Sequence, residues 1–199
     1  QYFPKARKEI FGLDYGCGAW RSTRFLKFLR IEKVDSVDVN QTMLDEAKYA
    51  DIEGNYQLIE SGRIPALAET YDLAFSSFVF VEIGDEKEIN RIFKDIYRVL
   101  KPGGIFIVVT PSEEAFNPTH QWLSYQSYAV NSEFKSGQLI EFKIIDINLE
   151  LADYYWTHDD FKKWSEDAGF VQIVKYHPLG KMSDGIYWAS EWQISPYTI

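Results

Sequence analysis

The sequence predicts an α/β fold in which helices cover both faces of a mostly parallel sheet. Short apolar runs alternate with segments of helical periodicity over the first 110 residues, and this alternation is typical of such sheets. A glycine turn, Gly16-Cys17-Gly18, follows the first apolar run. Residues 105–110 form a continuous apolar run bounded by glycines and a proline, as expected of a strand that is buried on both faces.

The elements of this sheet are expected in chain order. Strands are predicted at residues 10–15, 34–39, 56–60, 71–78 and 105–110. Apolar residues at helical spacing predict helices around residues 25–29, 43–47 and 89–100. Ser22 and Thr23 are possible caps of the first helix. Lys101-Pro102-Gly103-Gly104 is expected to end the third helix, because glycine and proline cannot continue it and lysine suits its negative end.

After Pro111 the regular alternation stops, which predicts an insertion after the fifth strand. Residues 112–136 are polar and aromatic and show no clean period. In residues 139–151 the apolar positions change parity at Ile144-Ile145, which indicates a bulge or a break between two strands.

The C-terminal part is expected to return to the sheet. Thr157-His158-Asp159-Asp160 can cap a helix that ends at Gly169. Residues 170–176 and 191–199 are predicted strands, the last of them antiparallel to the others. The expectation is therefore a seven-stranded sheet in a single domain, residues 1–199, without a linker.

Charge and cysteine content restrict the class of protein. The 199 residues carry 21 Lys and Arg against 30 Asp and Glu, a net charge of −9, which disfavours nucleic acid and anionic lipid as partners. Cys17 is the single cysteine, and we find neither an export leader nor an apolar run of membrane-spanning length. We expect a cytoplasmic protein, monomeric or homodimeric, that contacts neither nucleic acid nor membrane.

Polar residues end several of the predicted strands. Ligands of open parallel sheets bind beyond the carboxyl ends of the strands, where Asp14, Asp38, Glu60 and the pair Ser76-Ser77 are expected. A glycine turn allows close approach of the backbone to a ligand, and an acid at the end of the second strand can accept hydrogen bonds from ribose hydroxyls. A dinucleotide is disfavoured, because the third glycine of its fingerprint would fall at Arg21.

An ordered series of motifs resembles one family. The first, Asp14-Tyr15-Gly16-Cys17-Gly18-Ala19, resembles motif I of the class I S-adenosylmethionine-dependent methyltransferases. Five further segments match this family in order: residues 37–39, 60–65, 71–77, 99–104 and 156–170. The resemblance covers residues 9–199 and is closest to the small-molecule members. It implies a Rossmann-like fold and S-adenosylmethionine as cofactor.

The resemblance also implies roles for individual residues. Asp14 would hold the ammonium group of the cofactor, Gly16 and Gly18 would pass near its methionyl part and ribose, and Asp38 would take both ribose hydroxyls. Glu60 and the amide of Ser61 would receive the adenine, and the carbonyl of Ser76 or Ser77 would contact the methionyl amino group. Trp20 departs from the pattern, because it stands where the family usually has a third glycine.

The expected reaction is methyl transfer to a small molecule. The methyl of the sulfonium is electrophilic, so the protein must chiefly align an acceptor, and a base is needed where the acceptor loses a proton. Candidate bases are Glu82, His120 and His158; the three histidines show no metal-ligand spacing, so no metal site is expected. Whether oxygen, nitrogen or carbon receives the methyl group stays open.

The aromatic insertion is expected to cover the acceptor pocket. We assign this role to residues 112–156, since they follow the fifth strand and include Phe116, Trp122, Tyr125 and Tyr128. The sequence also allows a non-catalytic binding module on the same fold, which Trp20 would suit, or an aminopropyl-type transferase, for which no paired-aspartate site is present.

Overall fold

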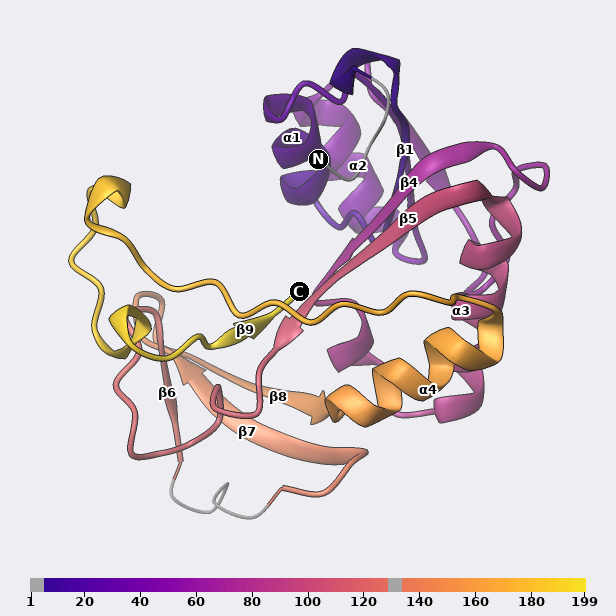
Figure 1. Cartoon of the computed structure of the whole chain (residues 1–199). Coiled ribbons are helices and arrows are strands. Elements are labelled where there is room, and N and C mark those ends of the chain that lie inside the picture. The colour runs from indigo at the N-terminus through magenta and orange to yellow at the C-terminus, as the bar shows by residue number, and fades with distance from the viewer. Residues whose placement is uncertain (1–5, 129–133) are drawn as a thin grey trace.

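The computed structural model describes residues 6–128 and 134–199 and contains a six-stranded main sheet (Figure 1). Its strands lie in the order β3-β2-β1-β4-β5-β9. Their bounds are β1 Phe11–Tyr15, β2 Lys33–Asp38, β3 Asn55–Leu58, β4 Tyr71–Ser77, β5 Leu100–Pro111 and β9 Tyr197–Thr198. Neighbouring strands β1 to β5 pair in parallel, and β9 is antiparallel to β5. The predicted α/β class and the antiparallel last strand are confirmed.

Four α-helices cover the two faces of this sheet (Figure 1). They are α1 Arg21–Phe28, α2 Gln41–Ala50, α3 Glu86–Val99 and α4 His158–Ala168. On one face Leu26 of α1 packs with Leu73 and Phe75 of β4. On the other face α3 and Trp164 of α4 pack in one cluster with Leu13 of β1. Helices thus pack on both faces of the sheet. Because β1, β2 and β4 are parallel, their carboxyl ends lie at the same edge of the sheet.

The predicted caps of α4 are confirmed. Thr157 and Asp160 form a capping box, in which each side chain accepts a hydrogen bond from the backbone of the other residue. The helix ends at Gly169, whose φ of 112° is a conformation that favours glycine. None of the helices in the described ranges is long and apolar enough to cross a membrane.

The insertion forms a second, smaller antiparallel sheet in the order β6-β7-β8. Its strands are β6 Tyr125–Ser127, β7 Gln138–Ile144 and β8 Leu149–Tyr155. The change of parity at Ile144-Ile145 marks the end of β7, so it is a break between two strands. Residues 129–133 of the insertion lie outside the described residues.

The prediction of seven strands in the main sheet is wrong by one strand. Residues 170–176 are not a strand, and only Tyr176 exchanges backbone hydrogen bonds with Ile199, at 2.8 and 2.9 Å. The expected last strand is shortened to Tyr197–Thr198, because Ser190–Trp192 form a 3-10 turn and Pro196 has no N–H to donate. Such a short strand leaves residues 170–176 without a ladder partner.

The expectation for residues 105–110 is also only partly met. The strand begins earlier, at Leu100, directly after α3. Its apolar residues pack toward both faces, Ile105 and Ile107 toward α1 and Phe106 and Val108 toward α3. However, the side chains from Ile105 to Val109 are only half-buried. The absence of a seventh strand beside this stretch accounts for the exposure.

Candidate active site

The glycine turn after β1 has the conformation that glycine permits. Gly16 and Gly18 have φ values of 72° and 51°. The amide of Gly16 donates to the carbonyl of Val37 at 2.8 Å, which ties the turn to β2. A Cβ on Gly16 would lie 2.1 Å from Val79, whereas a Cβ on Gly18 would meet nothing within 4 Å. Backbone at Gly18 is therefore open to close approach by a ligand.

Asp38 stands at the end of β2 and faces this turn. One carboxylate oxygen accepts a hydrogen bond from the amide of Gly18 at 2.8 Å, and the other accepts one from the amide of Asn40 at 2.8 Å. These two bonds fix the carboxylate beside the turn, and each oxygen keeps a further lone pair for a hydroxyl donor.

Asp14, at the end of β1, is fully buried and only partly satisfied. Ser22 and Thr23 donate their hydroxyl hydrogens to the same oxygen, Oδ2, at 2.7 and 2.6 Å. The other oxygen, Oδ1, is buried without a hydrogen-bond partner. The pKa of this carboxyl is raised to about 6. Burial is the largest cause, the hydroxyls of Thr23 and Ser22 lower the pKa, and the charge of Asp38 adds to the increase.

The contacts of Ser22 and Thr23 correct a sequence-based expectation. Trp20 is the N-cap of α1 and forms no side-chain cap, so the two hydroxyls do not cap the helix. They lie in its first turn and hold Asp14 instead. The same first turn is thus linked directly to the end of β1.

Ser76 brings a second unsatisfied polar group to the neighbouring strand. It lies in β4, the strand that pairs in parallel with β1. In this pairing Asp14 of β1 lies opposite Phe75 of β4. Its Oγ is buried and makes no hydrogen bond. Ser77 is half-buried, and Phe78 follows with φ 59°, a strained conformation for a bulky residue. Strain of this kind is concentrated at functional sites.

The segment expected to receive adenine is held near β1 by Tyr15. The amide of Gly62 donates to the Tyr15 hydroxyl at 3.0 Å. Ser61 is half-buried, and its carbonyl accepts a hydrogen bond from Arg91 at 3.3 Å. Glu60 is exposed and forms an ion pair with Arg63 at 2.6 Å. This pair is solvated, so it is weak and Glu60 can exchange partners.

Comparisons with known proteins agree with this arrangement. A family model described as a methyltransferase domain matches residues 13–108, from within β1 to within β5. The chain belongs to the class I S-adenosylmethionine-dependent methyltransferases. The family and its cofactor, S-adenosylmethionine, are as the motifs predicted. The buried, unpartnered oxygens of Asp14 and Ser76 and the open space at Gly18 fit a cationic ligand of this kind.

Two curated relatives and one solved structure illustrate the likeness. Malonyl-[acyl-carrier protein] O-methyltransferase of Salmonella typhimurium is 28% identical over 130 residues, 65% of this chain and 50% of the relative. Ubiquinone/menaquinone biosynthesis C-methyltransferase of Vibrio cholerae is 30% identical over 181 residues, 84% of this chain and 66% of the relative. The chain therefore spans about half to two thirds of their length. A SAM-dependent methyltransferase from Methanosarcina mazei shares the fold, with a TM-score of 0.66, 16% identity and coverage of 96% of this chain and 91% of that chain.

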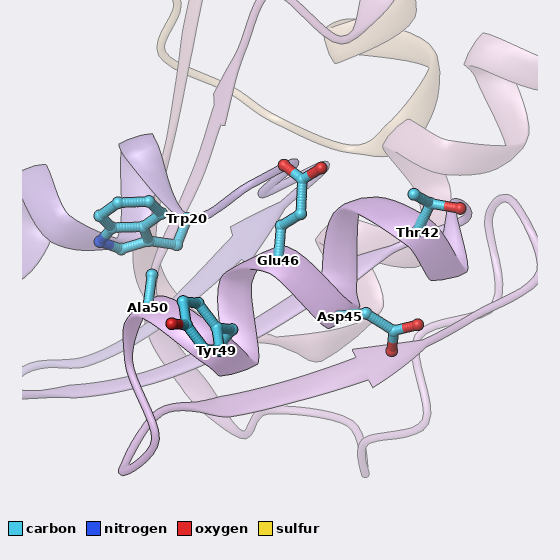
Figure 2. Close-up of a pocket in the computed structure, with 6 residues that line it drawn as sticks. All are labelled: Trp20, Thr42, Asp45, Glu46, Tyr49 and Ala50. Carbon is cyan, nitrogen blue, oxygen red and sulfur yellow. The ribbon is translucent and has the colours of Figure 1, made fainter.

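Trp20, where this chain departs from the family motif, packs toward α2. Its indole contacts the cluster of Cys17, Leu44, Ala47 and Tyr56, and with residues of α2 it lines a pocket (Figure 2). Trp20 adopts φ 70°, which is costly for a residue with a Cβ. Packing of the indole in the cluster offsets part of this cost.

The three candidate bases lie in three different elements. His120 pairs with Glu114 at 2.8 Å and packs against Trp122 within the insertion. His158 is the first residue of α4, and burial, followed by the charge of Lys175, lowers its pKa. Glu82 is exposed in a 3-10 turn, Phe80–Glu82, that follows β4. No hydrogen bond or ion pair links the three in the part of the chain that the structure describes.

Sequence reasoning did not select Asp153, which lies close to Glu82. The pKa of Asp153 is raised to about 7, chiefly by burial and also by the charge of Glu82. Within the described residues its carboxylate has no hydrogen bond or ion pair. Trp156 fixes β8 against the 3-10 turn, because its indole N–H donates to the carbonyls of Phe80 and Ile83 at 3.1 and 3.0 Å. The only available signal was an acid on the apolar face of a strand, opposite Ile140.

The aromatic rings of the insertion are mostly its own core. Phe116, Trp122 and Tyr125 are buried in a cluster with Ile140 and Phe142. Burial of these three rings makes them core residues of the insertion, so they do not offer a ligand free apolar faces. Tyr125 nevertheless keeps a buried hydroxyl that has no hydrogen-bond partner among the described residues. Burial raises the pKa of this hydroxyl, and the nearby Tyr197 and Glu191 raise it further.

Proposed function

We propose that this chain transfers a methyl group from S-adenosylmethionine to a small-molecule acceptor held between the carboxyl edge of the main sheet and the insertion of residues 112–156. The observation that carries the proposal is a pair of buried oxygens at adjacent strand ends, Asp14 Oδ1 and Ser76 Oγ, that have no hydrogen-bond partner among the described residues. Buried polar atoms are normally hydrogen-bonded, so two orphans at one edge indicate a missing ligand.

The cofactor side of the site would use acids and backbone together. Asp14 would bind the ammonium group through Oδ1, with Ser76 or Ser77 beside it. Asp38, oriented by the amides of Gly18 and Asn40, would accept both ribose hydroxyls. Glu60 and the amide of Ser61 would receive the adenine. When bound, the cofactor supplies an electrophilic methyl group.

The acceptor side would use the 3-10 turn after β4 and the insertion. Phe78 follows the β4 end and its ring packs on Tyr197 at 5.6 Å, which gives this side an apolar wall. Asp153 would take a proton from an acceptor that must lose one, because a base with a pKa near the working pH is the most efficient. Glu82 would raise the proton affinity of Asp153. His120 and His158 stay alternative bases.

The substrate class is supported by the relatives. The two curated relatives are named for O-methylation of an acyl-carrier-bound malonyl group and for C-methylation in quinone biosynthesis. Both names describe organic acceptors other than nucleic acid, in agreement with the net charge of −9. We extend this class, an organic small molecule or its carrier-bound form, to the present chain.

Calorimetric titration with S-adenosylhomocysteine tests the proposal. We expect saturable binding with one site, and release of S-adenosylhomocysteine from S-adenosylmethionine when a library of small acceptors is screened. Absence of binding would favour a non-catalytic module on this fold. Binding without turnover of any acceptor would leave the cofactor site standing and contradict the proposed acceptor class.

A further inference from the structure

A pocket between the start of α1 and the outer face of α2 is lined by none of the residues assigned to the cofactor (Figure 2). Its volume is about 560 Å³. Its walls are Trp20, Thr42, Asp45, Glu46, Tyr49 and Ala50. The five residues of α2 recur at spacings of three and four and therefore share one face of the helix. Leu44 and Ala47, on the other face, are buried in the core.

The charged residues that line this pocket are both acidic. Asp45 and Glu46 line it, whereas no lysine or arginine does. Asp45 accepts a hydrogen bond from Gln41 at 2.7 Å, and neither carboxylate belongs to an ion pair among the residues that the structure describes. In Figure 2 the Glu46 side chain rises from the middle of α2, between the indole of Trp20 and Thr42. A cation entering the pocket would meet carboxylates without a resident counter-ion.

Two aromatic rings form the other end of the pocket. Figure 2 shows the indole of Trp20 above the last turn of α2, where Tyr49 and Ala50 lie. The guanidinium of Arg24 lies 5.2 Å from the centre of the indole ring, although Arg24 is not part of the pocket wall. This indole therefore already attracts one cation, as expected of a tryptophan face. Tyr49 is 89% exposed and supplies a second ring that a ligand can cover.

We propose that this pocket binds an organic ammonium cation, with its charged head between the rings of Trp20 and Tyr49 and the carboxylate of Glu46, and with Asp45 adding negative charge at the other end of the pocket. Aromatic faces and carboxylates together select a cation with an apolar body over a strongly hydrated metal ion. The surrounding protein favours this choice, since its net charge is −9. The site is separate from methyl transfer and does not depend on the proposed function.

Titration with choline, followed by NMR of the ¹⁵N-labelled full chain, tests the proposal. We expect choline to shift the indole N–H signal of Trp20 with saturation, and to do so equally when S-adenosylhomocysteine is present in excess. The uncharged isostere 3,3-dimethylbutan-1-ol should bind at least about fivefold more weakly, and added salt should weaken choline alone. Equal binding of the two compounds, or displacement of choline by S-adenosylhomocysteine, would overturn the proposal.

Surface variants locate the binding site. Tyr49→Ala and Glu46→Gln should each weaken choline binding about two- to fivefold, and both residues are exposed, so the fold should tolerate the changes. Tyr187→Ala and Glu53→Gln are matched controls at exposed positions outside the pocket and should leave binding unchanged. Equal losses in the controls and in the pocket variants would show that choline does not bind there.

Discussion

At Asp14, burial and hydrogen bonding act on one carboxyl group in opposite directions, and burial dominates. The pKa is about 6 in the folded chain against an ordinary value of 3.8. Between these values the folded chain holds a proton that the unfolded chain has released. The stabilisation linked to this proton is therefore fully present below about pH 4 and is lost as the pH rises through 6.

Asp14→Asn should consequently stabilise the free protein at pH 8 and change its stability little at pH 4. A shift from 3.8 to about 6 corresponds to roughly 3 kcal/mol in the free energy of unfolding. Urea unfolding at both pH values measures the difference. Because the amide cannot pair with an ammonium group as a carboxylate does, affinity for S-adenosylhomocysteine should fall at pH 8. A variant that is destabilised equally at both pH values would contradict this account.

Asp38→Ala should weaken binding of S-adenosylhomocysteine by about tenfold to a hundredfold. Charge-assisted hydrogen bonds contribute about 1.5–3 kcal/mol, and about 1.4 kcal/mol corresponds to a factor of ten. The change also removes the acceptor of the Gly18 amide, so the turn loses its orientation. Calorimetry on a variant with wild-type circular dichroism is the measurement. Unchanged affinity would exclude Asp38 from the ribose site.

At the scale of elements, the start of α1 shows what sequence patterns can and cannot predict. The glycine turn and the helix were predictable, because they depend on residues close together in the chain. Whether Ser22 and Thr23 cap the helix or donate to Asp14 could not be predicted from the sequence. It depends on β1 and α1 being packed together, and on a buried carboxylate that binds the two hydroxyls more strongly than free backbone amides do.

The contact between β8 and the 3-10 turn after β4 depends on a single indole. Trp156→Phe keeps the ring contacts but removes the indole N–H that donates to the carbonyls of Phe80 and Ile83. We expect a loss of about 1–2 kcal/mol in the free energy of unfolding and faster hydrogen exchange of residues 80–84. Trp188→Phe, which removes an indole bond to exposed Asp184, is the control. Equal exchange in both variants would show that Trp156 does not hold the turn.

Glu82→Gln should lower the pKa of Asp153. The negative charge of Glu82 is the second cause of the raised value, and the amide removes it, while the larger contribution from burial stays. Carboxyl ¹³C NMR of the labelled protein follows this titration directly. Glu150→Gln, on the same strand and largely exposed, should leave the pKa of Asp153 unchanged. A value that does not move in Glu82→Gln would place the two carboxylates too far apart to act together.

At the scale of the whole molecule, the sheet and the insertion divide the proposed site between them. The cofactor half was predictable, because strand ends and glycine turns carry local signals in a parallel sheet. The acceptor half of the proposed site could not be predicted from the sequence. Asp153 meets Glu82 only through the packing of β8, and the run at residues 170–176 has strand composition but, among the described residues, pairs with another segment only at Tyr176. Pairing between distant segments, which no local pattern records, decided both outcomes.

Tyr125 provides the test of whether the insertion serves the acceptor. Its hydroxyl is buried without a partner, and removing an orphaned polar atom should cost no stability. Tyr125→Phe should therefore keep or raise the melting temperature and keep affinity for S-adenosylhomocysteine. If the acceptor supplies the missing partner, kcat/KM for an acceptor found by screening should fall about tenfold. His120→Ala, which removes the contact to exposed Glu114, separates the two polar groups of the insertion. Full turnover in both variants would mean that the acceptor binds elsewhere and that residues 112–156 only pack on the sheet.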